Sequence, residues 1–163
     1  MAKHPGPLHT PLLGHAEYEA AVDAVLARAT SSIRIFDQTL GSAYNSTYRT
    51  DLLRNFFLAS RRNSLHIALH DTSALDRACP RLLGLLRIYG HAISVHQTRP
   101  AAKSIYDPFM IVDDCCFARR FHFDEIRGLC VYDDPAATQP LVERFAEIWE
   151  ESSPAVSATT LGL

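Results

Sequence analysis

Short apolar segments alternate with amphipathic segments of helical length along most of the chain. Three segments have the length and apolar content of buried strands: SIRIFD (32–37), LHIALHD (65–71) and HAISVHQT (91–98). Helical patterns lie before or between them, at 16–29, 48–62 and 80–90. Because strands connected through helices pair in parallel and are covered on both faces, this order predicts an α/β fold.

The alternation changes after residue 107. Three strand-like runs follow one another at 108–113, 115–121 and 127–134, and a helical pattern covers 140–152. Strands joined by tight connections favour antiparallel pairing. The sequence therefore predicts a three-layer α/β/α sandwich with a mixed sheet.

Both ends of the chain lack this periodicity. Residues 1–15 contain Pro5, Pro7 and Pro11 and predict an extended N-terminal arm, and residues 152–163 predict a disordered tail. The sequence thus predicts one domain over 16–151, in keeping with a chain of 163 residues.

Charge and hydropathy narrow the classes of partner. The chain has 16 Lys+Arg against 18 Asp+Glu, so no overall positive field favours nucleic acid or anionic lipid. No stretch approaches the roughly 18 to 20 apolar residues of a membrane span, and the first residues lack the apolar centre of a signal peptide. We expect a cytoplasmic protein with neither a membrane segment nor a nucleic-acid partner.

The four cysteines do not form a metal-binding pattern. No CxxC pair occurs among Cys79, Cys115, Cys116 and Cys130. On an extended strand the adjacent Cys115 and Cys116 would point to opposite faces. We expect free thiols, and the sequence predicts neither a metal site nor another cofactor.

The run YDPFMIVDD (106–114) resembles the signature strand of the phospholipase D-like superfamily, HxKxxxxD. Together with the order of elements, this resemblance covers 16–151 and implies one half-domain that faces a second copy across a shared active site. More narrowly, PRLLGLLRIYGHAISV, YDPFMIVDD and FAEIWEES resemble a bacterial branch of this fold that is sometimes joined to an acyltransferase-type domain.

The aligned residues differ from the signature at the positions of its nucleophile and its phosphate-binding residue. With the family's aspartate on Asp113, its nucleophilic histidine falls on Tyr106 and its phosphate-binding lysine on Pro108. The later GS and Asn of the family fall near Arg120, Phe121 and Asp124, where none is kept. Without imidazole and amine the resemblance does not imply covalent phosphoryl transfer, and we predict no catalytic residue.

Ligands of open α/β sheets sit beyond the carboxyl ends of strands. Asp37, His70 and either His96 or Gln97 are expected near such ends. On an extended strand only one of two adjacent arginines can face a cleft. The predicted ligand-binding residues are Asp37, His96, Tyr106, Asp113, Arg119, Arg120 and His122.

A purely structural interpretation stays open for the same residues. Asp37 would then cap a loop, and the two arginines would form ion pairs with Asp113, Asp114 or Glu125.

We therefore predict a non-catalytic phospholipase D-like domain that binds a small anionic ligand or mediates assembly. A homodimer is the expected assembly, because an isolated half would leave an apolar seam exposed. The alternative is a phosphodiesterase or other hydrolase whose catalytic residues have moved, for example to Asp37, His96, Tyr106 and His122.

Overall fold

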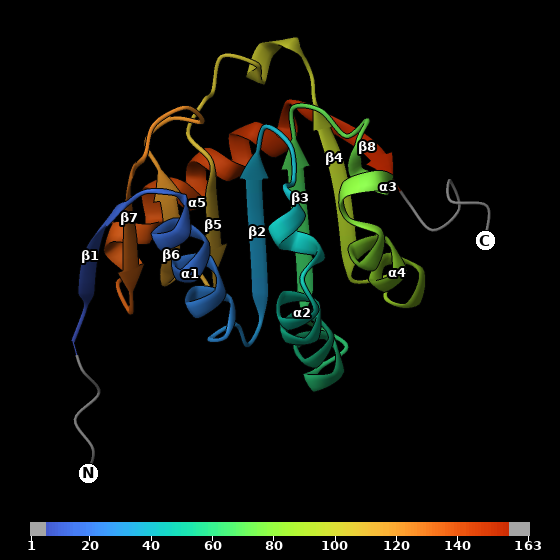
Figure 1. The fold of residues 1–163 in the computed structure, drawn as a ribbon, viewed down its shortest axis with the longest axis horizontal. Helices are drawn as coiled ribbons and strands as arrows, with labels where there is room; N and C mark the ends of the chain where they lie inside the picture. Colours follow the sequence, from blue (N-terminus) through green and yellow to red (C-terminus); the bar gives the residue numbers. More distant parts are fainter. Residues whose placement is uncertain (1–5, 157–163) are drawn as a thin grey trace.

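One mixed sheet of eight strands organises the protein in the computed structural model, which describes residues 6–156 (Figure 1). The spatial order of the strands is β1-β7-β6-β5-β2-β3-β4-β8. The strands are β1 (Leu8–Leu13), β2 (Ser32–Asp37), β3 (Ser64–Leu69), β4 (Ile93–Thr98), β5 (Phe109–Val112), β6 (Cys116–Arg120), β7 (Arg127–Tyr132) and β8 (Ser152–Val156).

Helices cover both faces of this sheet (Figure 1). The α-helices are α1 (His15–Leu26), α2 (Thr47–Ala59), α3 (Leu75–Ala78), α4 (Pro80–Ile88) and α5 (Pro135–Glu150), and two short 3-10 helices are η1 (Ser42–Asn45) and η2 (Pro100–Ala102). Helices α1, α2 and α4 pack with the larger apolar cluster on one face, and α5 packs with the smaller cluster on the other. The predicted three-layer α/β/α sandwich with a mixed sheet is confirmed.

Pairing changes from parallel to antiparallel at β2. Strands β2, β3 and β4, which are connected through helices, are parallel, whereas β5 pairs antiparallel with β2. Strands β5, β6 and β7 follow one another closely and are antiparallel. The carboxyl ends of β2, β3, β4 and β6 therefore meet at one end of the sheet, called here the carboxyl end.

Both chain ends contribute strands where the sequence predicts an arm and a tail. Leu8–Leu13 form β1 along β7, and Pro11 is tolerated because β1 is an edge strand. Ser152–Val156 form β8 along β4, so the predicted disorder is wrong for these residues. Residues 1–5 and 157–163 lie outside the described residues. Edge pairing uses backbone groups, so it requires no apolar side-chain pattern.

The last helix begins earlier than the sequence predicts. Asp134 is its N-cap and accepts a hydrogen bond from the Ala137 N–H at 3.0 Å, and Pro135 is the first helical residue. The sequence predicts that the helix starts at Pro140, but Pro140 lies inside α5. In the described part of the chain, no helix has the length and apolar content needed to span a membrane.

Candidate ligand site at the carboxyl end of the sheet

A buried arginine lies at the carboxyl end, beneath the start of α1. Arg120 is the last residue of β6 and only 8% exposed. Its guanidinium carbon lies 5.3 Å from the centre of the Tyr18 ring, and Nη1 lies 3.4 Å from Nδ1 of His15. Among residues 6–156, Nε of Arg120 has no hydrogen-bond partner. A buried guanidinium left incompletely bonded carries a free-energy cost that an anion would remove.

Asp37 ends β2 and faces the same cluster. Burial raises the pKa of the Asp37 carboxyl to about 7, although the Gln38 N–H and the charge of Arg120 both act to lower it. Its Oδ1 accepts a hydrogen bond from the Gln38 N–H at 2.7 Å. Near neutral pH this carboxyl is therefore partly protonated, and it compensates the charge of Arg120 only in part.

Tyr18 closes the inner side of the cluster. It is buried on α1, and burial, followed by the neighbouring Tyr44, raises the pKa of its hydroxyl well above the ordinary value. Tyr18 thus stays neutral, and its ring supplies an aromatic face for Arg120. His15, the first residue of α1, is exposed, so the cluster is open to solvent on that side.

A second buried arginine holds the helices around this cluster. Arg49 on α2 is 1% exposed, and it donates to Asp23 and Glu19 of α1, each at 2.8 Å. Its guanidinium carbon lies 4.4 Å from the centre of the Tyr44 ring of η1. This network ties α1, α2 and η1 together and is structural.

The rim contains the two positions aligned with the family's histidine and lysine. Tyr106 is 50% exposed, and its ring centre lies 5.3 Å from that of His122. Its carbonyl accepts the Phe123 N–H at 2.7 Å. Pro108 is buried, and its carbonyl accepts the Arg120 N–H at 3.0 Å. The segment just before β5 therefore lies directly beside Arg120 at Pro108.

Asp113 is not part of this site, which corrects the sequence prediction. It lies at the other end of β5, where its carboxylate accepts the N–H groups of residues 30–32 at 2.8 to 3.0 Å. The hydroxyls of Thr30 and Ser31 also donate to it. Burial acts to raise the pKa of Asp113, but these hydrogen bonds outweigh it and lower the pKa. Asp113 anchors the start of β2.

Arg119 points to the opposite face of the sheet from Arg120, as strand alternation requires. It donates to Asp107 at 3.1 Å, and Arg144 of α5 binds the other carboxylate oxygen. The structural interpretation of an ion pair thus holds for Arg119, but its partner is Asp107 and not Asp113, Asp114 or Glu125. The three residues line a groove of about 730 Å³ between β6, β7 and α5.

His96 also lies away from the group formed by His15, Tyr18, Asp37 and Arg120, called here the arginine cluster. Its ring stacks on Trp149 with centres 3.6 Å apart, and Nδ1 lies 2.8 Å from the Ser152 hydroxyl. Burial lowers its pKa, followed by the effect of nearby His66. His96 pairs with Ala68 inside the sheet rather than at its end. The predicted association of His96 with Asp37 is wrong because β4 continues for two further residues.

His70 directly follows β3, at its carboxyl end, but both ring nitrogens have partners. Nδ1 lies 2.6 Å from the Thr98 hydroxyl, and Nε2 lies 2.7 Å from the Ile105 carbonyl. Burial lowers its pKa. His70 thus fixes the segment before β5 and is not free for a ligand.

The family described as "Domain of unknown function (DUF7931)" matches residues 14–161. The chain belongs to this family. The match includes every residue of the arginine cluster. No protein with a curated description matches the sequence.

Solved structures show which fold this DUF7931 chain has. A phospholipase D family member, Nuc from Salmonella typhimurium, aligns over 93% of this chain and 99% of its own, with a TM-score of 0.61 and 14% identity. NucT from Helicobacter pylori aligns over 91% and 99%, with a TM-score of 0.54 and 14% identity. Phosphatidylserine synthase from Haemophilus influenzae Rd KW20 aligns over 98% and 42%, with a TM-score of 0.64 and 16% identity. The DUF7931 chain has the phospholipase D-like fold.

Two members of the cluster in this DUF7931 chain were missed from the sequence. Tyr18 fits the apolar stripe of α1, which indicates a core residue and no ligand role, and its ring does lie in the core. Nothing in the sequence indicated His15 as a site residue, because its position near Arg120 depends on the placement of α1 over β6 by β1. The alternation rule did indicate that only one of Arg119 and Arg120 faces this site.

Proposed function

We propose that this chain binds a small anionic ligand, a phosphate or phosphate ester, at the carboxyl end of the sheet without cleaving it. The observation that carries the proposal is Arg120, a buried guanidinium whose Nε is unsatisfied within the described chain. A guanidinium offers parallel donors that match two oxygens of a phosphate.

The surroundings of Arg120 support an anion over a cation. Asp37 is partly protonated near neutral pH, because burial raises its pKa to about 7. The first turn of α1 adds backbone N–H groups and the positive end of the helix dipole next to His15. A ligand that enters from the exposed side of His15 would reach both Arg120 and the first turn of α1.

The rim supports binding without turnover. A phenol is a weak nucleophile at neutral pH, and a proline ring has no charge or donor with which to hold a transferring phosphoryl group. Tyr106 and Pro108 therefore do not supply what covalent phosphoryl transfer requires.

The test is to titrate the full chain with inorganic phosphate and with a phosphomonoester, and to measure the binding affinity by calorimetry. We expect Arg120→Met to weaken binding at least about tenfold, because a charge-assisted pair is lost. Arg119→Met, which removes the neighbouring charge on the opposite face, should leave the affinity within about twofold. Equal affinity of Arg120→Met and the unchanged chain would contradict the proposal.

A phosphodiesterase with relocated residues is the second candidate. The Asp37 pKa of about 7 favours it, because a general acid or base works best near the pH of the reaction. His96 lies outside the cluster, which leaves Asp37, Tyr106 and His122 for such a role. Turnover of an activated phosphodiester that His122→Ala abolishes would establish this candidate in place of binding alone.

We further propose that two copies pair through the carboxyl end. Four large apolar side chains are exposed around it: Leu13, Tyr106, Phe121 and Ile126, at 44 to 59%. Burial of such a patch against a second copy is favourable, and a two-fold interface uses the same patch twice. A cytoplasmic location and association with an acyltransferase-type domain remain predictions.

Light scattering coupled to size-exclusion chromatography tests the pairing. We expect a dimer at tens of micromolar, a scale for ordinary interfaces. Phe121→Asp should give a monomer, whereas Leu58→Asp, on exposed α2 surface, should not. A monomer for the unchanged chain, or a dimer for Phe121→Asp, would exclude this interface.

A further inference from the structure

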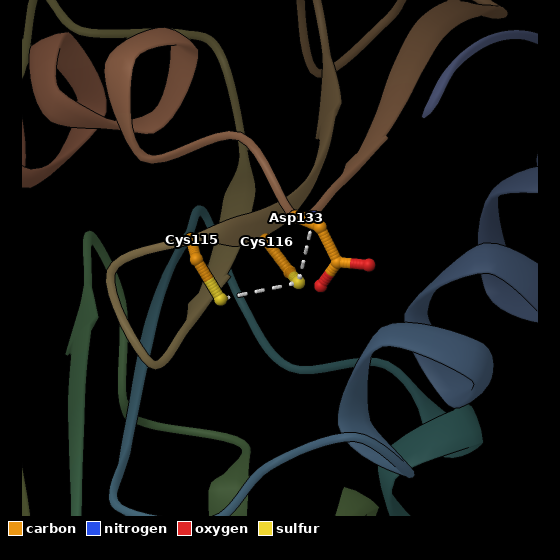
Figure 2. A group of neighbouring side chains, drawn as sticks. All are labelled: Cys115, Cys116 and Asp133. Atoms are coloured by element: carbon orange, nitrogen blue, oxygen red, sulfur yellow. Dashed lines mark hydrogen bonds between the residues drawn. The ribbon is translucent and has the colours of Figure 1, made fainter. Parts of the chain in front are cut away.

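Two thiols and a carboxylate converge at the end of the sheet opposite Arg120 (Figure 2). Cys115 ends the turn between β5 and β6, Cys116 begins β6, and Asp133 directly follows β7. The two sulfur atoms are 3.5 Å apart, and all three donor atoms lie within 4.8 Å of one another.

The backbone explains this convergence, which the sequence did not predict. Asp113 and Asp114 adopt positive φ angles of 54° and 56°, so Cys115 lies in the turn and not on the strand. Its thiol therefore comes to the same side as that of Cys116, and the expectation of opposite sides is wrong. Pairing of β6 with β7 then brings Asp133 alongside, with its N–H 3.5 Å from the Cys116 sulfur.

We propose that Cys115, Cys116 and Asp133 bind a thiophilic divalent cation of the Zn²⁺ class, with water as a fourth ligand. Two sulfurs bound at about 2.3 Å in a tetrahedral centre lie roughly 3.7 to 3.8 Å apart. The 3.5 Å separation is close to that value, so the thiols need little movement. Both thiols bind as thiolates and release their protons to solvent.

Charge around the thiols is consistent with a cation. The carboxylates of Asp113 and Asp133 act electrostatically on the Cys115 thiol, and Asp114 lies in the same turn. Arg28 and Arg34 are opposing charges: Arg34 pairs with Asp114, and Arg28 donates to Oδ2 of Asp133 at 3.0 Å and lies over the Tyr132 ring. Arg28 can keep Oδ2 while Oδ1 turns to the cation, an arrangement that orients a metal-binding carboxylate.

The test uses the reduced full chain, with Zn²⁺ in calorimetry and Cd²⁺ as a spectroscopic probe. We expect one equivalent per chain at this site, a sulfur-to-cadmium charge-transfer absorption, and a higher unfolding temperature with Zn²⁺. Cys115→Ser should remove the absorption and weaken binding at least about tenfold, and Asp133→Asn should weaken it about tenfold.

The control separates this site from other thiols and from the eight histidines of the chain. Cys79→Ala removes a buried thiol beside α4 and should leave the absorption and the affinity unchanged. The proposal is wrong if no cation binds below about 100 μM. It is equally wrong if Cys115→Ser retains the absorption, or if Cys79→Ala removes as much of it.

Discussion

The two ends of β5 have different roles. At one end Asp113 accepts five hydrogen bonds and anchors the segment that begins β2. At the other end Tyr106 is half exposed, and the nearby Arg120 is buried with an Nε that has no hydrogen-bond partner among the described residues. Asp113 thus supports the fold, whereas Tyr106 and Pro108 border the candidate site.

The largest expected effect is at the anchoring end. Asp113→Asn should lower the free energy of unfolding by about 2–3 kcal/mol, because charge-assisted hydrogen bonds to three backbone N–H groups are weakened. Asparagine tolerates the positive φ at this position, so backbone strain does not confuse the result. Urea unfolding at pH 7 measures it.

Asp114→Asn is the matched control, because Asp114 shares the positive φ and, within residues 6–156, its side chain pairs at the surface with Arg34 alone. We expect a change below about 1 kcal/mol for it. Equal effects of the two substitutions would show that Asp113 is no anchor.

A smaller, pH-dependent effect is expected at the Arg120 end. The Asp37 pKa is about 7 in the folded chain, above its ordinary value of 3.8, so ionisation of Asp37 opposes folding. That cost is absent below about pH 4, grows up to about pH 7, and is constant above it. Asp37→Asn should therefore stabilise the chain by about 1–2 kcal/mol more at pH 8 than at pH 5.

Thermal or urea unfolding at the two pH values measures this difference. Asp51→Asn, at an exposed residue of α2, is the control substitution, measured at the same two pH values. A gain that is the same at pH 5 and pH 8 would mean that Asp37 ionises normally.

The smallest expected effect on stability is at Tyr106. Tyr106→Ala should cost less than about 1 kcal/mol, because half of the side chain is already exposed. If the rim contributes to binding or pairing, phosphate affinity or the dimer fraction should change more than stability does. A loss of stability as large as that of Asp113→Asn would remove the contrast between the two ends of β5.

Repeating the phosphate titration at two pH values tests the effect of Asp37 on binding. Protonated Asp37 repels an anion less than ionised Asp37 does, so binding should be tighter at pH 6 than at pH 8. Asp37→Asn should remove most of this dependence, apart from the ionisation of phosphate itself. Calorimetry of both chains at the two pH values provides the measurement.

Local pattern was sufficient for most of the fold. The apolar runs at 32–37, 65–71 and 91–98 coincide closely with β2, β3 and β4, because a buried strand needs consecutive apolar residues. The change to antiparallel pairing followed from short connections after β5. The edge strands β1 and β8 were not predicted as strands, since backbone pairing at an edge leaves little trace in the side chains.

The candidate site was predicted in part. Asp37 was predicted from its place at a strand end and Arg120 as one of a basic pair, and the charge of Arg120 does act on Asp37. His96 was also predicted from a strand end and Asp113 from the family resemblance, but Asp113 lies at the far end of β5 and His96 stacks inside the sheet on Trp149. Strand ends can be located by pattern, whereas distances between them depend on register and strand order.

The sequence by itself determined the order of elements and the mixed sheet, because these depend on the identity and spacing of neighbouring residues. Only the tertiary structure decided that Arg120 lies under α1 while Arg119 meets Asp107, and that Cys115 and Cys116 turn their thiols to Asp133. These relations join residues far apart in the chain, and packing across the sheet sets them, which no local periodicity records.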